Sequence, residues 1–363
     1  MTPNQTDLSQ VMPLIHLSGG LVATQLPGDA CAEVATRRGG TVVDRLPVAE
    51  PRELFVALNR GGYRSVGFEL YTCSEELEAI WPAQWQVVWP QRGRVGKETE
   101  TLWHALANTG AQANDAGFFD ISSRIAFELF AASLRLRDLG KAYSKQLHGH
   151  FATSGPWKEG WFEDLYSHEV RLAVHAAFSE LHTCLDYLGE FIARYVLKEE
   201  RRVDSWSGLL NILKKRDAPS TPLTEMVREV SIRATEKPGW CAELTEYRNV
   251  FTHTAPLGQA THWPFTLARN LEVRTGKVVP ALKCPLPWNV MTLKQARVPA
   301  LPYRDEKQLP ALLRELEAEA FKTPDTFDYL TMAYRNVVEL AAYVGGHSPF
   351  EPQPLSLSSE DLA

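Results

Sequence analysis

The sequence has few cysteines, and no two of them are spaced as a CxxC pair. An odd number of scattered cysteines gives no zinc signature and is typical of a reducing compartment. HExxH, phosphate-loop and Ser-His-Asp patterns are also missing, which argues against the corresponding metalloprotease, NTPase and hydrolase chemistries. The sequence therefore predicts no metal site and no cofactor. The five cysteines are Cys31, Cys73, Cys184, Cys241 and Cys284.

Long apolar runs and an excess of positive charge are missing too. No stretch approaches the roughly eighteen uninterrupted apolar residues that a membrane-spanning helix needs. Residues 1–10 have neither the basic start nor the apolar stretch of a signal peptide. We therefore expect no membrane association and a cytoplasmic location. The net charge of −6 argues against a general polyanion binder, so any nucleic-acid site must be local.

The 363 residues are enough for two domains. Near the N-terminus, residues 40–46, 65–73 and 85–89 are β-branched or aromatic runs bounded by Gly and Pro, which favours strands. Residues 51–60 have Pro at a first-turn position followed by an apolar series, which is typical of a helix. The sequence predicts a small α/β domain over residues 1–105, and no pattern in it indicates a function.

After a polar connector at residues 91–117, helical patterns dominate. The predicted fold class is mainly α, with a helical bundle over residues 110–345 that contains a loop-rich insertion at about 256–310. Thr275-Gly276 favours a hairpin within that insertion, and residues 346–363 are typical of a disordered acidic tail. The predicted helices span residues 118–147, 167–197, 206–215, 222–236, 240–254 and 324–344.

Residues 167–197 carry the clearest helical signal. Apolar side chains recur there with a 3.6-residue period over about eight turns, which predicts a helix with one buried stripe. The stripe consists of Val170, Val174, Ala177, Phe178, Leu181, Leu185, Leu188 and Ile192.

The segment Glu246-Tyr-Arg-Asn-Val-Phe-Thr-His-Thr254 has the residues most suited to chemistry. In a helix ended by Pro256, one face holds the apolar side chains. Asn249 and His253 are four residues apart and stack on the opposite side, with Arg248 between the two faces. This geometry presents an arginine, an amide and an imidazole away from the core side of the helix. The apolar face consists of Trp240, Leu244, Tyr247 and Phe251.

These three polar groups are suited to RNA cleavage without a metal. The Arg248 guanidinium can hold two phosphate oxygens and does not lose its proton. The His253 imidazole can give or take a proton near neutral pH, and its place at a helix C-terminus favours the charged form. RNA supplies its own nucleophile, the 2′-hydroxyl, so a proton-transfer group and a charge clamp suffice.

The Arg248-Asn249-x3-His253 pattern resembles the R-polar-x(3–5)-H motif of the HEPN superfamily (higher eukaryote and prokaryote nucleotide-binding domains). The order of elements, long helices first and the motif on a later helix, is also similar over residues 118–345. The resemblance implies a HEPN-like helical bundle and a metal-independent ribonuclease of the kind found in toxin, antiviral defence and CRISPR systems. It further implies a homodimer in which two motifs meet in one cleft.

By the same resemblance, His253 is the general acid/base, Arg248 stabilises the phosphorane-like transition state and Asn249 orients one of them. The expected products carry a 2′,3′-cyclic phosphate and a 5′-hydroxyl, and an antitoxin or sensor is a further candidate partner. Two alternatives remain open. The bundle is a non-catalytic nucleotide- or protein-binding module that dimerises, or activity resides in the N-terminal domain and the bundle is a scaffold.

Other histidines and basic residues are interpreted first as structural. His168, His175 and His182 are seven residues apart, so neighbours lie about 10 Å apart along a helix, too far to share one metal ion. They fit the edge of a packed stripe, with Asp186 on the same flank, or else a cleft facing the Arg248 helix. His148-Gly149-His150 is interpreted as a helix end at Gly149 rather than a metal site.

Two further segments are interpreted in the same way. Lys214-Lys215-Arg216 is a small basic group that fits a solvated face better than a phosphate site. Tyr334-Arg335-Asn336-Val337 repeats the Tyr-Arg-Asn-Val string of the motif helix, but position 340 is Leu where a histidine would be needed. We therefore expect this repeat to serve packing.

Overall fold

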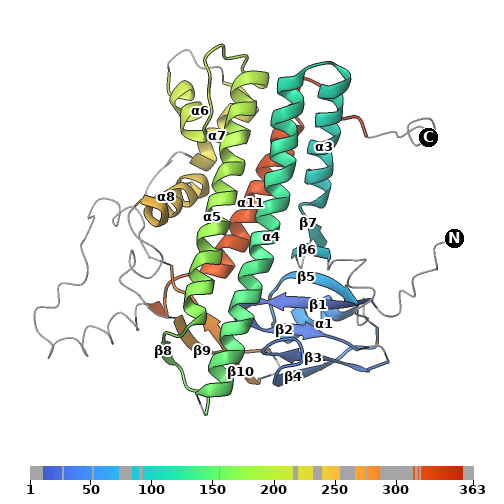
Figure 1. Ribbon diagram of the computed structural model, residues 1–363, viewed down its shortest axis with the longest axis vertical. Coiled ribbons are helices and arrows are strands. Elements are labelled where there is room, and N and C mark those ends of the chain that lie inside the picture. The colour runs from blue at the N-terminus through green and yellow to red at the C-terminus, as the bar shows by residue number, and fades with distance from the viewer. Residues whose placement is uncertain are drawn as a thin grey trace, which may run out of the picture. The chain divides into compact units, whose positions relative to one another are not determined.

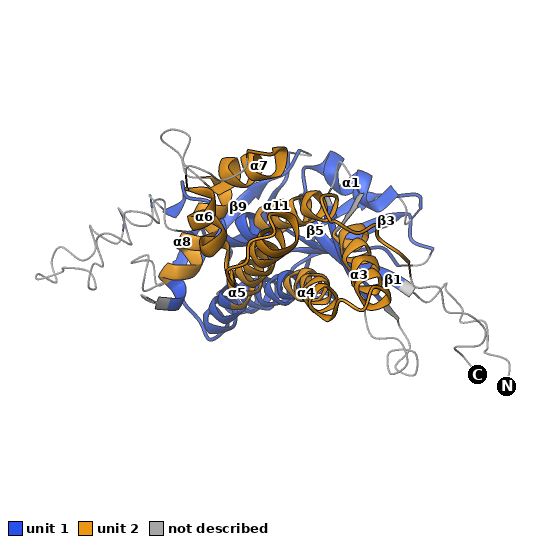
Figure 2. Cartoon of the chain, turned by 90° about the horizontal axis from the view of Figure 1, so that it is seen from above, with its two compact units in different colours: residues 1–95, 134–175, 251–331 blue, residues 96–133, 176–250, 332–363 orange. Residues whose placement is uncertain are grey.

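The computed structural model divides the chain into two compact units. Unit 1 comprises residues 1–95, 134–175 and 251–331, and unit 2 comprises residues 96–133, 176–250 and 332–363 (Figure 2). The structure describes residues 11–26, 28–50, 53–72, 84–89, 93–154, 156–215, 220–231, 239–253, 266–274, 276–286, 314, 318 and 320–354.

Unit 1 contains a seven-stranded antiparallel sheet in the order β4-β3-β2-β1-β5-β6-β7. Helix α1 (Leu54–Gly61) precedes β5, and its Leu54 and Leu58 are fully buried. The predicted strands at residues 40–46, 65–73 and 85–89 and the predicted helix at 51–60 are confirmed, within a few residues at their ends. The strands are β1 (Val11–Leu17), β2 (Val22–Thr24), β3 (Cys31–Ala35), β4 (Val42–Pro47), β5 (Ser65–Thr72), β6 (Gln84–Trp89) and β7 (Gly93–Val95).

A second sheet of unit 1 has three strands, in the order β10-β9-β8. The strands are β8 (Gly160–Phe162), β9 (Thr266–Glu272) and β10 (Val278–Lys283). The predicted hairpin is confirmed, because Leu271 pairs with Val279 and Glu272 with Val278. Gly19 (φ 79°) lies against β10, where a Cβ atom would come within 2.7 Å of the Ala281 side chain, so this close approach requires glycine.

Unit 2 is helical. It contains α3 (Lys97–Gln112), α6 (Trp206–Leu213), α7 (Pro222–Ser231) and most of α8 (Trp240–His253). Three longer helices contribute residues to both units, namely α4 (Ala116–Thr153), α5 (Tyr166–Phe191) and α11 (Thr326–Gly345) (Figure 1). A short π-helical turn, Ile192–Val196, follows α5. Helices hold most of the regular structure, so the mainly α expectation is confirmed at this coarse level, together with a β-rich N-terminal part.

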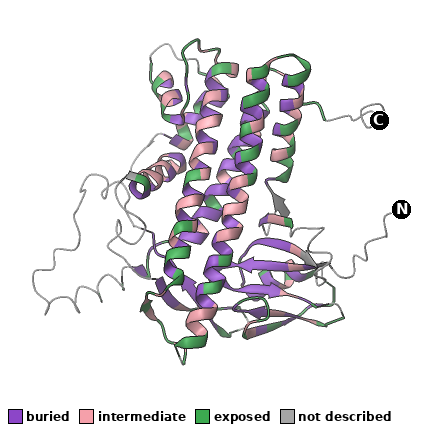
Figure 3. Cartoon of the chain, viewed as in Figure 1, coloured by how far each residue is buried: buried purple, intermediate pink, exposed green. Residues whose placement is uncertain are grey.

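The stripe predicted for residues 167–197 is buried along its whole length. Each of its eight members, from Val170 to Ile192, is at most 1% exposed. Figure 3 shows buried positions along one side of α5 and in the strands of the sheet. At about 25 cal/mol per Å² of buried apolar surface, each of the larger side chains contributes roughly 1.5–3 kcal/mol, so the periodic face is a principal source of stability for this helix.

The predicted polar connector at residues 91–117 was wrong. Residues 97–112 form α3, which buries Trp103 and Leu106 completely. The indole Nε1 of Trp103 donates to the Ala341 carbonyl oxygen of α11 at 3.2 Å. Few apolar residues were enough here, because one large indole and its hydrogen bond anchor an otherwise polar helix.

Two further expectations need correction. Gly149 does not end a helix, since α4 continues to Thr153, and a single glycine costs a long helix only about 1 kcal/mol. Residues 346–354, assigned from the sequence to the tail, pack on α3 and α4: the Phe350 and Phe118 rings lie 4.8 Å apart, and the Gln353 backbone N–H donates to Thr109 Oγ1 at 3.1 Å. Residues 355–363 lie outside the described part of the chain.

The predicted domains were contiguous, with boundaries at 1–105, 110–345 and 346–363, whereas each compact unit combines three segments. Of the predicted insertion at 256–310, residues 266–274 and 276–286 are described, and they form the β9–β10 hairpin of unit 1. Among the described residues, no helix is long and apolar enough to cross a membrane.

Candidate functional site

Helix α8 presents the predicted apolar face to the core. Leu244, Tyr247 and Phe251 are at most 3% exposed, and Cys241 and Val250 join them in the core. Trp240, which was assigned to the same face, is half-buried. The 3.6-residue period therefore predicted correctly which face of α8 is buried. The polar side chains of the helix point away from that face.

Arg248 and Asn249 lie on that polar flank and are both half-buried. The Arg248 Nη1 group donates to Asn249 Oδ1 at 3.2 Å, so the two polar residues of the predicted motif are in contact. His253 is the last residue of α8, and its side chain lies outside what the structure describes. The expected alignment of Asn249 with the His253 imidazole stays a prediction.

Arg248 and Asn249 line a cavity of about 350 Å³ within unit 2. Helix α5 contributes His182 and Asp186, and α8 also contributes Glu246. The first turns of α6, the end of α7 and the start of α8 complete the wall with small polar and apolar side chains. The cavity therefore brings an arginine, an amide, an imidazole and two carboxylates together from two helices that are distant in sequence.

His182 and Asp186 form a close pair on α5. Their spacing of four residues places the side chains one helical turn apart, and His182 Nδ1 lies 3.2 Å from Asp186 Oδ2. The His182 side chain is 13% exposed and that of Asp186 25%. This partial exposure allows a ligand in the cavity to reach the pair while most of its surface is held by packing.

The neighbouring helix fixes Asp186. The backbone N–H of Trp206, at the start of α6, donates to Asp186 Oδ1 at 2.9 Å, and Ser205 caps the same helix by accepting from the Gly208 N–H at 3.2 Å. The indole of Trp206 donates to Ser231 Oγ of α7 at 2.9 Å. Asp186 thus satisfies an N–H of α6 that has no partner within the helix, and the carboxylate is held in one orientation.

The cysteine and tyrosine of α8 are unsuited to ionise near neutral pH. Burial raises the pKa of the Cys241 thiol well above its usual value, and only the thiolate is a good nucleophile. Burial, together with the negative charge of Glu243, raises the pKa of Tyr247 in the same direction. The titratable chemistry of the cavity therefore rests with the histidine and the carboxylates.

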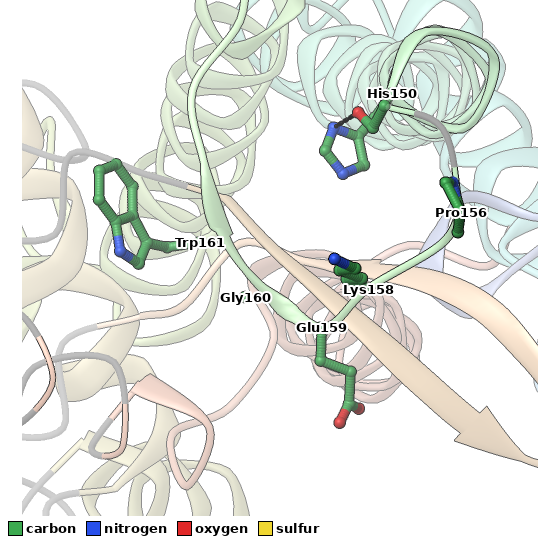
Figure 4. Close-up of a pocket in the computed structure, with 7 residues that line it drawn as sticks. His150, Pro156, Lys158, Glu159, Gly160 and Trp161 are labelled. Carbon is green, nitrogen blue, oxygen red and sulfur yellow. Dashed lines mark hydrogen bonds between the residues drawn. The ribbon is translucent and has the colours of Figure 1, made fainter.

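A second cavity, of about 260 Å³, lies in unit 1 and is lined by His150, Lys158, Glu159 and Trp161 among others. Figure 4 shows His150 and Lys158 beside it and the Glu159 carboxylate directed away from His150. The His150 ring stacks on Phe162 at 3.8 Å between centroids, and its Nδ1 lies 2.9 Å from Ser154 Oγ. Burial lowers the pKa of His150, so packing favours its neutral form.

The remaining sequence candidates have separate surroundings. His168 is exposed, and the His175 ring lies 5.6 Å from that of Phe251. Among the described residues, no group of three or more His, Cys, Asp or Glu side chains could hold a metal ion. Tyr334 and Arg335 of the repeated string are at most 8% exposed, as expected for packing.

His148 contacts Thr36 through Nδ1 at 2.9 Å, which ties α4 to the N-terminal sheet within unit 1. Lys214 and Lys215 are exposed, as expected for a solvated face, and Arg216 lies outside the described residues.

The sequence pattern places His182 and Asp186 on one flank of the helix, where a packing role was expected for them. The signal that could have identified the pair was its i, i+4 spacing, which allows a direct His–carboxylate contact. Sequence could not supply the position of α6, whose Trp206 N–H donates to Asp186 and whose side chains help to line the cavity. Searches against protein-family models, curated proteins and solved structures find nothing that matches this chain.

Proposed function

We propose that this protein is a metal-independent endoribonuclease of HEPN type that cleaves RNA through attack of the 2′-hydroxyl. The observation that carries the proposal is the half-buried Arg248–Asn249 pair lining a cavity that also holds an imidazole. An arginine fork can bind two oxygens of the scissile phosphate and stabilise the charge that develops in the transition state. Partial enclosure strengthens this interaction relative to bulk water.

In the proposed reaction His253 is a general acid/base, Arg248 clamps the phosphate and Asn249 orients Arg248 through the contact at 3.2 Å. The 2′-oxygen attacks phosphorus, the bond to the 5′-oxygen breaks, and the products carry a 2′,3′-cyclic phosphate and a 5′-hydroxyl. The cleft is completed in a homodimer, as the motif implies. The biological role that fits such an activity is that of a toxin or antiviral defence effector, held in check by an antitoxin or sensor.

The test is to incubate purified protein with total RNA in EDTA and to read the ends of the fragments. Wild type is expected to give 2′,3′-cyclic phosphate and 5′-hydroxyl ends, and His253→Ala and Arg248→Ala are expected to give almost none. Exposed residues provide matched controls: His168→Ala on α5 and Arg201→Ala, both outside the cavity lining, should cleave like wild type. Cleavage by His253→Ala at the wild-type rate would remove the proposal.

A second candidate function is a non-catalytic module that binds a nucleotide or a protein and dimerises. Two carboxylates, Asp186 and Glu246, line the same cavity as Arg248, and this charge balance favours a ligand with both positive and negative groups over a bare phosphate. This function predicts saturable binding with no change in RNA length, and an Arg248→Ala variant that loses binding while remaining folded.

A further inference from the structure

Cleavage of RNA by its own 2′-hydroxyl requires two proton transfers. One proton leaves the 2′-oxygen as the P–O2′ bond forms, and another must reach the 5′-oxygen as the P–O5′ bond breaks, or a poor alkoxide leaving group results. No electrons are exchanged with a cofactor. His253 accounts for one of these transfers in the proposed function, and a second group that carries a proton would speed the other.

We infer that His182, held by Asp186, is this second group and that it protonates the 5′-oxygen of the leaving nucleotide. The inference rests on the proposed function and adds a catalytic residue to it. The two side chains line the same cavity as Arg248 and Asn249, which places an imidazole of α5 in one cavity with the phosphate clamp of α8. Across such a cavity, one helix can hold the phosphate while the other meets the leaving group.

The geometry of the pair suits an acid. His182 directs Nδ1 to Asp186 Oδ2 at 3.2 Å, so Nε2 is the ring nitrogen left to face a ligand. A general acid must begin its step protonated and must reach the leaving oxygen. The Trp206 N–H bond to Asp186 Oδ1 at 2.9 Å fixes the carboxylate, and through it the orientation of the imidazole.

The other two histidines of the heptad-spaced set differ in their surroundings. His168 is exposed, and His175 lies beside the Phe251 ring, where burial lowers its pKa. Of the three, His182 has the carboxylate one turn away and a place in the cavity wall. The other two histidines of α5 are therefore controls of the same residue type for His182.

A substrate with a better leaving group tests the role of His182. An RNA oligonucleotide that wild type cuts at one mapped site is prepared with oxygen or with sulfur at the 5′-bridging position of that site. A thiolate leaves without a proton, so it does not need a general acid. His182→Gln and His182→Ala are expected to slow cleavage of the oxygen substrate by roughly 10²–10⁴-fold, and to slow the sulfur substrate by less than roughly tenfold.

Matched variants separate this role from others. His253→Ala is expected to slow both substrates, and His168→Gln neither. Asp186→Asn keeps an oxygen for the Trp206 N–H but loses the charge, and it should show a smaller loss that sulfur again rescues. Far-UV circular dichroism and thermal unfolding establish that each variant is folded, and His182→Gln retains a hydrogen-bonding side chain if His182→Ala does not fold.

Each outcome of these assays supports or overturns the role proposed for His182. Rescue of the His182 and Asp186 variants by sulfur supports the assignment. Equal slowing of both substrates, or no slowing of either, overturns it while leaving the endoribonuclease proposal intact, provided that His253→Ala remains inactive. If wild-type protein cuts neither substrate nor total RNA, the proposed function fails and this inference fails with it.

Discussion

The His16–Glu69 pair of unit 1 and the His182–Asp186 pair of unit 2 have the same chemistry in different environments. His16 Nε2 lies 3.4 Å from Glu69 Oε1, and the two side chains are 2% and 6% exposed. In unit 2 the atoms are 3.2 Å apart, but the side chains are 13% and 25% exposed and line a cavity. A His–carboxylate contact is therefore no sign of reactivity by itself, and access decides which pair can act on a ligand.

The unit 1 pair is a structural network. Lys141 Nζ lies 2.9 Å from Glu69 Oε1, and the Trp85 and His16 rings meet in a T-shaped arrangement with their centroids 5.4 Å apart. Burial opposes the charge on Glu69, but the contacts with His16 and Lys141 outweigh it and lower the pKa of this carboxyl to about 2. The Glu69 carboxylate is thus ionised in the folded protein, at the place where β1 and β5 pair.

In this comparison of the two units, the largest effect is expected on activity, at Arg248. Arg248→Ala is expected to reduce the rate of RNA cleavage by about 10²–10³-fold, as removal of a transition-state donor does, with little change in the free energy of unfolding. Arg248→Lys keeps the charge but loses the two-pronged geometry, so it should recover only a small part of the rate. Single-turnover cleavage and urea unfolding measure the two quantities. Full activity in Arg248→Ala would show that the cavity is not the site.

At Glu69 we expect a loss of stability with no loss of activity. Glu69→Gln breaks a buried pair and should lower the free energy of unfolding by roughly 3 kcal/mol, with cleavage per folded molecule unchanged. Because the folded pKa of Glu69 is about 2 and its unfolded value is 4.5, its contribution is present above pH 4.5 and is lost as the pH falls towards 2. Urea unfolding from pH 5 to pH 3 should therefore show a shallower decline for Glu69→Gln than for wild type. Equal slopes would contradict the assigned role.

At Asp325 of unit 1 we expect a smaller effect on the unfolding free energy, with the opposite dependence on pH. Burial, and then the nearby Asp328, raise the pKa of Asp325 to about 7, although the Tyr143 hydroxyl and the Cys284 N–H both donate to its Oδ1 at 2.9 Å. The folded protein holds a proton here between pH 3.8 and about 7 that the unfolded chain releases, so stability falls as pH rises through that range.

Asp325→Asn keeps Oδ1 as an acceptor and removes the titration. Between pH 5 and pH 8, wild type should lose roughly 2–3 kcal/mol more unfolding free energy than Asp325→Asn. The quantity to compare is the slope, because the amide also changes the absolute stability. A steeper decline in the variant would contradict the expected sign. Since Asp325 is 4% exposed, we expect this sealed carboxyl of unit 1 to affect stability alone. The rate of RNA cleavage per folded molecule should not change in Asp325→Asn.

Local periodicity predicted much of the fold. The eight-residue stripe of α5, the apolar face of α8 and the β9–β10 hairpin all follow from patterns within one segment, because burial of one face sets the spacing of apolar residues. Strands β1, β2 and β3 were not recognised, although their pairing is antiparallel and local. Short strands need partners in the sheet for their stability, and their sequences alone carry a weak signal. Helix α3 was missed because Trp103, rather than a long stripe, anchors it.

For the candidate site, the sequence by itself determined that α8 would turn Arg248 and Asn249 away from its core face, since helix geometry fixes those directions once the apolar side is buried. It also determined that His182 and Asp186 would lie one turn apart on α5. Only the tertiary structure decided that these two flanks share one cavity. This arrangement depends on the Trp206 N–H at the start of α6, which donates to Asp186, and on contacts between residues far apart in the chain.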